Sequence, residues 1–247
     1  MNRLLLLAYA LVAYAGFLAV TAWSVAFLAN VHLASTIDDN STGPALIAVG
    51  VNLVLLGAFA LQHSVMARDG VKRQMRRVVP AAAERSTYVL AADLLLALLL
   101  WQWRPIDGWV WHIRDEPWRV ALWICFGLGW ALAVAATYMI DHFDFVGLRQ
   151  AASGRLTSGA FVERWAYAWV RHPLLLGLLI AFWATPDMSV GHLLFAAAST
   201  AYVLVGIRLE ERDLRRHLGE AYQEYAARTP ALVPRPRLHS AVGSAEQ

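Results

Sequence analysis

The stretch LLLLAYALVAYAGFLAVTAWSVAFLA, residues 4–29, decides the class of fold, because 26 consecutive residues carry no charged side chain. A helix rises 1.5 Å per residue, so about 20 apolar residues cross the hydrocarbon core of a bilayer, which is about 30 Å thick. A cleavable signal peptide has a shorter apolar core and a small-residue cleavage site. We therefore expect residues 4–29 to be retained as a membrane-spanning helix.

Three further apolar segments have a similar length. They are Pro44–Met66, Ser86–Trp103, which holds Asp93, and Val120–Ile140. The composition agrees, since 59% of the 247 residues are hydrophobic and only 16% are charged, against about 25% in soluble domains. The chain is predicted to be an integral membrane protein with four spans and no separate soluble domain.

The pattern changes after the fourth span. The apolar run Pro173–Trp183 is too short to cross a bilayer alone, residues 184–189 (ATPDMS) are predicted as a turn, and Val190–Ile207 is apolar again. We interpret the two apolar runs as a helical hairpin.

A helical tail is expected after the hairpin. The second hairpin helix is predicted to continue from Arg208 to about Leu218, with Gly219 as its C-cap, and a short helix to follow with Tyr222 and Tyr225. The predicted fold is therefore all-α: four spans, then a C-terminal helical hairpin and a cytoplasmic helical tail. Residues 1–236 are expected to form a single membrane-embedded domain and residues 237–247 a disordered end.

The basic residues indicate the orientation. Eighteen of the 21 Lys and Arg residues fall on one side of the predicted spans, and only Arg104, Arg114 and Arg119 fall on the other. The positive-inside rule then places both termini in the cytoplasm, as expected for a protein of the bacterial inner membrane. Sorting and contact with anionic membrane lipid account for these charges, so nucleic acid is not an expected partner.

Metal binding is not expected. Cys125 is the only cysteine, which excludes an intrachain disulfide and a multi-cysteine metal site. The histidines lack the i, i+4 spacing of a helix-borne pair of ligands.

Several polar residues are predicted at one depth of the membrane. Gln62 and His63 end the second span, Asp93 lies two turns into the third, His142 follows the fourth, and Arg171 and His172 begin the hairpin. Because polar groups inside a bilayer are costly, this coincidence indicates a polar pocket that opens to the cytoplasm. The alternative is that each side chain is separately hydrogen-bonded, or reaches to the interface.

Short motifs add a resemblance. The sequence RHP at residues 171–173, Gly177, EERDL at residues 210–214, Gly219, Tyr222, Tyr225 and LVPRP at residues 232–236 resemble the C-terminal signature of the isoprenylcysteine carboxyl methyltransferase superfamily. Within it, the stretches ALQHSVMAR (60–68), ERSTYVL (84–90), WQWRP (101–105), DHFDFVGLRQ (141–150) and IAFWATPDMSVGHLLFA (180–196) are similar to the methanethiol S-methyltransferase branch.

This resemblance implies an enzyme that transfers a methyl group from S-adenosylmethionine to a small apolar thiol, methanethiol, and forms dimethyl sulfide. It implies a cofactor tunnel under the hairpin that the tail closes. The implied cofactor-binding residues are Arg171 and His172 at the amino-acid part, Glu210 and Glu211 at polar groups, Tyr222, Tyr225 and Pro234 around the nucleoside, and Gln150. One residue departs from the pattern, because Leu175 stands where the superfamily has a tyrosine.

Thiol methylation favours a nearby base, because an alkyl thiol is mostly protonated at neutral pH. His142 is the first candidate, and His63 and His172 follow. His142 and its neighbour Asp141 cannot share a helix face, so Asp144 or Asp93 is expected to orient the ring.

Two alternatives stay open. One is a related methyltransferase that acts on another thiol or a carboxylate, or a superfamily member tied to nitrogen-oxide metabolism; the identity of the product discriminates these. The other is a non-enzymatic membrane protein, which predicts polar residues through the full depth of the membrane.

Overall fold

The structure, a computed structural model, describes residues 2–39, 43–154 and 163–234. The predicted disordered end, residues 237–247, lies outside them. The α-helices within these ranges are α1 (Arg3–Leu28), α2 (Ala45–Met66), α3 (Asp69–Met75), α4 (Glu84–Gln102), α5 (Glu116–Ile140), α6 (His142–Phe145), α7 (Leu148–Ser153), α8 (Pro173–Trp183), α9 (Val190–Leu218) and α10 (Glu220–Arg228). Two 3₁₀-helices, η1 (Ala81–Ala83) and η2 (Trp165–Ala168), and two short strands, β1 (Trp109–His112) and β2 (Asp187–Ser189), complete the described elements.

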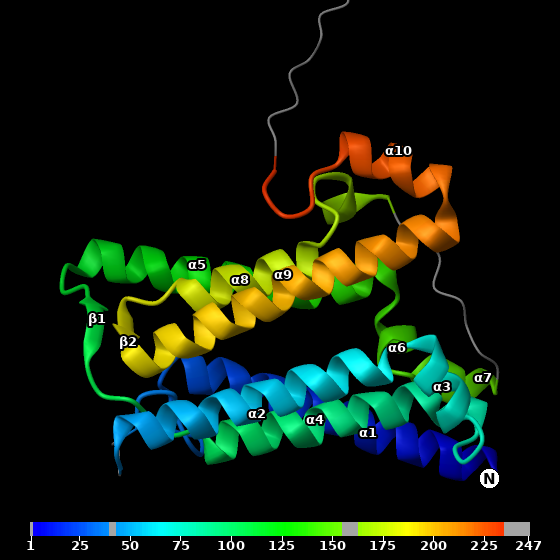
Figure 1. The fold of residues 1–247 in the computed structure, drawn as a ribbon, viewed down its shortest axis with the longest axis horizontal. Coiled ribbons are helices and arrows are strands. Elements are labelled where there is room, and N and C mark those ends of the chain that lie inside the picture. Colours follow the sequence, from blue (N-terminus) through cyan, green and yellow to red (C-terminus); the bar gives the residue numbers. More distant parts are fainter. Residues whose placement is uncertain (1, 40–42, 155–162, 235–247) are drawn as a thin grey trace, which may run out of the picture.

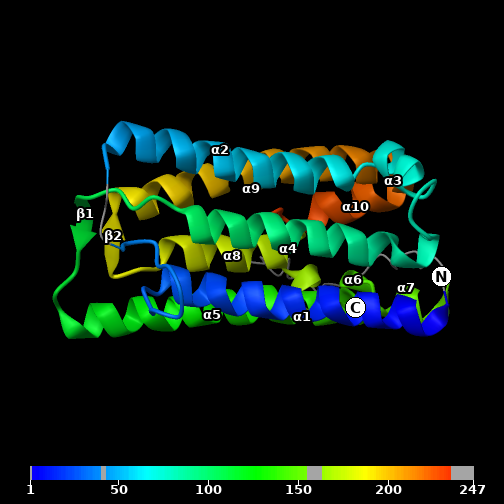
Figure 2. The ribbon, with the colours of Figure 1, turned by 90° about the horizontal axis from the view of Figure 1, so that it is seen from below.

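The all-α membrane fold is confirmed. Four helices, α1, α2, α5 and α9, are long and apolar enough to cross a membrane. The predicted third span, Ser86–Trp103, falls on α4, which is not among these four helices; it carries Asp93 and runs beside α1 and α2 (Figures 1 and 2). The fourth of them is instead α9, which was predicted as the second helix of the hairpin. The second hairpin helix and the first tail helix form one continuous helix, α9, of 29 residues.

The long helices form two layers. Figure 1 shows α5, α8 and α9 in one layer and α1, α2 and α4 in the other, and Figure 2 shows the same helices from below. Buried aromatic and aliphatic residues from both layers, among them Phe27, Leu99, Trp103, Phe182 and Phe195, form the core. Burial of these side chains holds the layers together.

The helices α5 and α8 pack backbone to backbone. A Cβ added at Gly177 would lie 2.6 Å from the backbone nitrogen of Ala133, and one added at Gly129 would lie 2.7 Å from the carbonyl oxygen of Gly177. Each helix thus presents a small-xxx-small pair, Gly129 with Ala133 and Gly177 with Ala181, which lets membrane helices approach closely. This contact positions α8, which begins at Pro173, the last residue of the RHP motif.

A two-stranded antiparallel sheet closes one end of the bundle. Strand β1 pairs with β2, and the Trp111 indole nitrogen donates to the Thr185 carbonyl oxygen at 3.0 Å. Arg119 binds both carboxylate oxygens of Asp187, each at 3.0 Å. The turn predicted at residues 184–189 therefore contains strand β2, because the segment 109–112 offers it unpaired backbone groups.

The tail helices lie at the opposite end of the bundle. As predicted, α9 ends at Leu218, and Gly219 follows with a left-handed φ of +59° that favours glycine. The segment after α10 returns to the start of α8, where the backbone nitrogens of Arg171 and His172 donate to the carbonyl oxygens of Pro230 (2.9 Å) and Ala231 (3.1 Å). The tail is thereby attached to the hairpin.

Candidate active site

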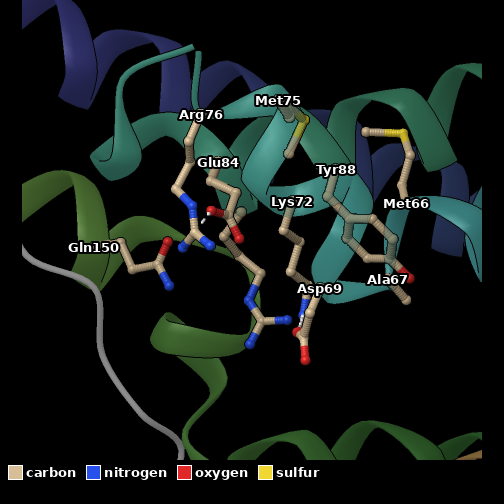
Figure 3. A pocket seen from close by; sticks show the side chains of 10 residues that line it. Met66, Ala67, Asp69, Lys72, Met75, Arg76, Glu84, Tyr88 and Gln150 are labelled. Atoms are coloured by element: carbon tan, nitrogen blue, oxygen red, sulfur yellow. Dashed lines mark ion pairs between the residues drawn. The ribbon is translucent and has the colours of Figure 1, made fainter. Parts of the chain in front are cut away.

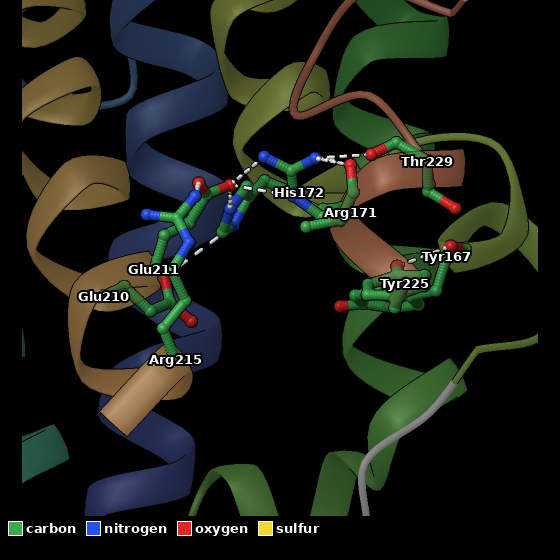
Figure 4. Close-up of polar contacts among 9 residues, drawn as sticks. Tyr167, Arg171, His172, Glu210, Glu211, Arg215, Tyr225 and Thr229 are labelled. Carbon is green, nitrogen blue, oxygen red and sulfur yellow. Dashed lines mark hydrogen bonds and ion pairs between the residues drawn. The ribbon is translucent and has the colours of Figure 1, made fainter. Parts of the chain in front are cut away.

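A buried charged cluster lies where α8 begins, α9 leaves the bundle and the tail returns (Figure 4). The Arg171 guanidinium donates from Nε to Glu211 Oε1 at 2.8 Å and makes a second bond to the same oxygen from Nη2. Arg215 Nη2 donates to Glu211 Oε2 at 3.0 Å, and His172 Nε2 lies 3.2 Å from Oε1. The side chains of Arg171 and Glu211 are 11% and 9% exposed, so each charge depends on the other for its solvation.

Arg171 also holds the tail. Its Nη1 donates to the carbonyl oxygens of Ala226, at 3.1 Å, and Thr229. The guanidinium therefore donates hydrogen bonds to both the Glu211 carboxylate of α9 and the end of α10. Its geometry is that of a clamp between the hairpin and the tail, whereas the resemblance implied a direct contact with a ligand.

Glu210 and His172 line the same cluster. His172 is buried, and its Nδ1 lies 3.7 Å from Glu210 Oε2. The side chain of Glu210 is 57% exposed, so this carboxylate is free to meet a ligand that enters from outside the bundle. Pro173 begins α8 at a position where a missing N–H costs no hydrogen bond.

Two tyrosines of α10 form the wall beside this cluster. Tyr222 and Tyr225 are both buried, and their ring centroids lie 6.1 Å apart. The Tyr225 hydroxyl donates to the carbonyl oxygen of Tyr167 at 2.6 Å. Burial, followed by the charge of Glu163, raises the pKa of Tyr225 to about 12, so its hydroxyl stays protonated at physiological pH. Pro234 ends the described chain, and Leu175, half-buried in the first turn of α8, contributes no hydroxyl.

His142 lies in an aromatic surrounding at the end of α5. Its ring stacks on Tyr138, with centroids 4.1 Å apart. Nδ1 lies 2.8 Å from Thr137 Oγ1 and Nε2 lies 3.1 Å from the Tyr14 hydroxyl. The contacts that orient the ring are thus hydroxyl groups, in place of the expected carboxylate. Burial lowers the pKa of His142, and nearby Asp141 partly opposes this.

The two predicted carboxylates occupy different places. Asp144 is buried in α6. The backbone nitrogen of Asp144 donates to Oδ1 of Asp141, the N-cap residue of this helix, at 3.2 Å. Asp93 is buried against α1, where a Cβ added at Gly16 would lie 3.1 Å from its Oδ2. Within the described part of the chain, that oxygen has no hydrogen-bond partner.

His63 belongs to a third polar cluster, formed by α2, α4 and α9. Its Nε2 lies 2.8 Å from the Tyr88 hydroxyl, and its ring stacks on Phe59 at 5.4 Å. Tyr202 of α9 closes the cluster, with its ring centroid 6.5 Å from that of His63 and its hydroxyl 3.4 Å from Ser64 Oγ. Sequence reasoning missed Tyr88 and Tyr202, although a tyrosine within an apolar span was a signal for both.

Gln150 lines a cavity of about 270 Å³ beside α3 (Figure 3). Its other lining residues are Met66, Ala67, Asp69, Lys72, Met75, Arg76, Glu84, Arg85 and Tyr88. Arg76 pairs with Glu84 at 3.2 Å, and the buried Oε1 of Gln150 has no partner among the described residues. None of the described residues that line this cavity belongs to the Arg171 cluster, with which the resemblance grouped Gln150.

The chain has close relatives of stated activity. It is 47% identical over 244 residues to a methanethiol S-methyltransferase of Mycobacterium tuberculosis, which covers 97% of this chain and all of the relative. It is 48% identical over 240 residues to methanethiol S-methyltransferase 2 of Bradyrhizobium diazoefficiens, which covers 94% of this chain and 91% of the relative.

A more distant relative is nurim of Xenopus laevis, 30% identical over 177 residues that cover 67% of this chain and 62% of the relative. No family model matches the chain, and no solved structure matches it.

Proposed function

Because the chain belongs to the methanethiol S-methyltransferase family, we propose that it transfers a methyl group from S-adenosylmethionine to methanethiol within the membrane and releases dimethyl sulfide. The observation that carries the proposal is the buried cluster in which RHP at residues 171–173 meets EERDL at residues 210–214. Arg171 and Glu211 are 40 residues apart in the sequence. The fold joins the two motifs by a direct ion pair between these side chains.

The residues of this cluster match the chemical groups of S-adenosylmethionine. Its amino-acid end carries an ammonium group, which the exposed carboxylate of Glu210 can meet, while Arg171 and Glu211, paired with each other, hold this part of the site in place. Its nucleoside is flat and amphipathic, and Tyr222 and Tyr225 offer buried aromatic faces. When bound, S-adenosylmethionine supplies an electrophilic methyl group on a positively charged sulfur.

The protein's contribution is a site of low dielectric next to fixed charges. The reaction of a sulfonium with a thiolate cancels two opposite charges, so an apolar surrounding favours the transition state relative to the separated ions. The two helical layers provide such a surrounding. The clamp made by Arg171 excludes water at one end, because it ties α9 to residues 226–229 of the tail.

The orientation follows from charge. The loops and tails at the α3 and α10 end carry most of the basic residues, so we place this end and both termini in the cytoplasm. The donor then enters from the cytoplasm. Methanethiol and dimethyl sulfide are small and apolar, and both cross lipid freely, which makes a membrane location suitable. We treat residues 1–236 as one functional domain.

The test is direct. Purified protein in detergent is incubated with S-adenosylmethionine and methanethiol, and dimethyl sulfide is measured in the headspace by gas chromatography. We expect product from the wild type and from Arg216→Ala, whose side chain is 60% exposed on helix α9. Arg171→Ala, which releases the clamp, is expected to yield none. Absence of dimethyl sulfide from a wild type that binds S-adenosylmethionine would refute methanethiol as the acceptor and favour another thiol or a carboxylate.

A further inference from the structure

Methylation of a thiol leaves a proton to be removed. The reaction forms one S–CH₃ bond to methanethiol, breaks the S–CH₃ bond of the sulfonium donor and breaks the S–H bond of the thiol. The electron pair stays on the thiol sulfur and the proton must leave. In a site buried between helices, this requires a base and a route to water.

His142 has no free lone pair for that proton. The single hydroxyl proton of Thr137 is donated to the carbonyl oxygen of Val134 at 2.7 Å, so Nδ1 of His142 must donate to Thr137 Oγ1. The other nitrogen, Nε2, then accepts from the Tyr14 hydroxyl. Both ring nitrogens are occupied, and the ring is held between aromatic side chains.

His63 has the complementary arrangement. Its Nε2 contacts the Tyr88 hydroxyl at 2.8 Å, whereas its buried Nδ1 has no hydrogen-bond partner among the described residues. If the ring served only to link α2 to α4, burying a second, unpaired nitrogen would be a cost without a purpose. The titratable groups that face the ring are Tyr88 from α4 and Tyr202 from α9, beside Ser64 of its own helix.

The His63 cluster and the charged cluster share helix α9. Tyr202, which contacts the His63 ring, precedes Glu211 by nine residues, which corresponds to about 13.5 Å of helix rise. His63 therefore lies deeper in the bundle than the Arg171 clamp, on the side of the apolar interior where a small thiol is soluble.

Tyr88 connects His63 to the polar cavity beside α3 (Figure 3). The same tyrosine whose hydroxyl contacts His63 Nε2 lines that cavity, together with Lys72, Arg76, Glu84 and Gln150. A cavity of about 270 Å³ with charged walls has room for several water molecules. The contact thus joins a buried imidazole to a space large enough for water at the basic end of the bundle.

We propose that His63 is the base that deprotonates the thiol and that Tyr88 passes the proton to the cavity. The thiol proton moves to Nδ1, the Nε2 proton moves to the Tyr88 oxygen, and the Tyr88 hydroxyl proton moves to water in the cavity. One proton leaves for each methyl group transferred, and His63 is then protonated at Nδ1. After the product has left, Nδ1 gives up its proton to water that enters the vacated site and Nε2 takes one proton back through Tyr88, so the ring regains its starting tautomer with no further net change. This inference rests on the proposed function, since it assigns the acceptor side of the same reaction.

The acidity of the acceptor tests the base. Methaneselenol is already ionised at neutral pH, because selenols are much stronger acids than thiols, so its methylation needs no base. Under reducing conditions we expect His63→Gln to lower turnover of methanethiol by about 100-fold or more and that of methaneselenol only a few-fold. Tyr88→Phe should lower methanethiol turnover less, and it should increase the solvent isotope effect, because proton removal becomes slower. Tyr9→Phe is the matched control, since it removes a hydroxyl that bonds Thr87, one residue along α4, at 3.1 Å.

Each outcome is decisive. Equal losses with both acceptors would show that His63 supports the structure only, and full methanethiol turnover in His63→Gln would also overturn the inference. If the wild type methylates neither acceptor, the proposed function fails instead. Should His63→Gln no longer bind S-adenosylmethionine, ¹⁵N NMR of the wild-type histidines still decides: the inference requires His63 protonated at Nε2, and protonation at Nδ1 would refute it.

Discussion

Replacing Gly177 with alanine should loosen the contact between α5 and α8. The new Cβ would meet the Gly129 carbonyl oxygen at 2.5 Å and the Ala133 nitrogen at 2.6 Å, both of them backbone atoms that cannot rotate away. The helices must then separate. Overpacking of this kind costs about 1–3 kcal/mol, which corresponds to a fall of roughly 2–12 °C in melting temperature for a chain of this size.

The control is a glycine on an open face. Gly127, also in α5, has no atom within 4 Å of an added Cβ, so Gly127→Ala should not lower stability and should gain up to about 1 kcal/mol from helix propensity. Both variants are compared by thermal denaturation in the same detergent, followed by loss of the monodisperse peak. Equal melting temperatures for Gly177→Ala and the wild type would refute the close backbone contact.

The same contact predicts that substitutions at its two glycines have non-additive effects on stability. Gly129→Ala places a Cβ 2.7 Å from the Gly177 carbonyl oxygen, so it separates the same pair of helices. Once the first substitution has moved them apart, the second should cost less than it does alone. Strict additivity in the double variant would mean that the two glycines act at independent places.

The remaining predictions concern buried polar groups. Glu211→Ala leaves the Arg171 guanidinium buried without its carboxylate and should lower the free energy of unfolding by about 3–5 kcal/mol, with partial recovery in Glu211→Asp, as measured by thermal denaturation. Tyr225→Phe removes the hydrogen bond to the Tyr167 carbonyl oxygen and should lower the free energy of unfolding by about 1 kcal/mol. Because folding raises the pKa of Tyr225 from 10.0 to about 12, the stability that Tyr225 contributes should be constant below pH 10 and fall as the pH rises from 10 to about 12. A stability curve that is flat to pH 12 would contradict this. Burial lowers the pKa of His142, so the stability that His142 contributes should be complete above its ordinary pKa of 6.5 and decrease as the pH falls below 6.5. His142→Gln should abolish this pH dependence of stability, while the pH profile of turnover between 6 and 9 keeps its shape. A changed turnover profile would restore His142 as the base.

Much of the fold was predictable because it depends on local properties. Uninterrupted apolar segments such as residues 4–29 specify membrane helices by their length alone. Gly219 marked the end of α9, since only glycine adopts its backbone conformation easily. Strand β2 was not predictable, because a strand of three residues, Asp187–Ser189, forms only where a partner such as β1 is present.

The site was predictable in part. The motifs singled out Arg171 and Glu211, and the structure joins them, but their clamping of the tail depends on carbonyl groups of Ala226 and Thr229 that have no sequence signature. The pairing of His63 with Tyr88 crosses two helices, and only the structure shows which nitrogen of the ring it leaves unpaired.

The sequence by itself determined that this protein lies in a membrane, where its long apolar helices lie along the chain, and which methyltransferase family it resembles. Only the tertiary structure decided which polar side chains meet: His63 with Tyr88, His142 with Tyr14, and Gln150 with a cavity separate from Arg171. The reason is geometric. Helix length is additive along the chain, whereas a helix turns about 100° with each residue, so the face that a side chain presents depends on how every neighbouring helix is packed.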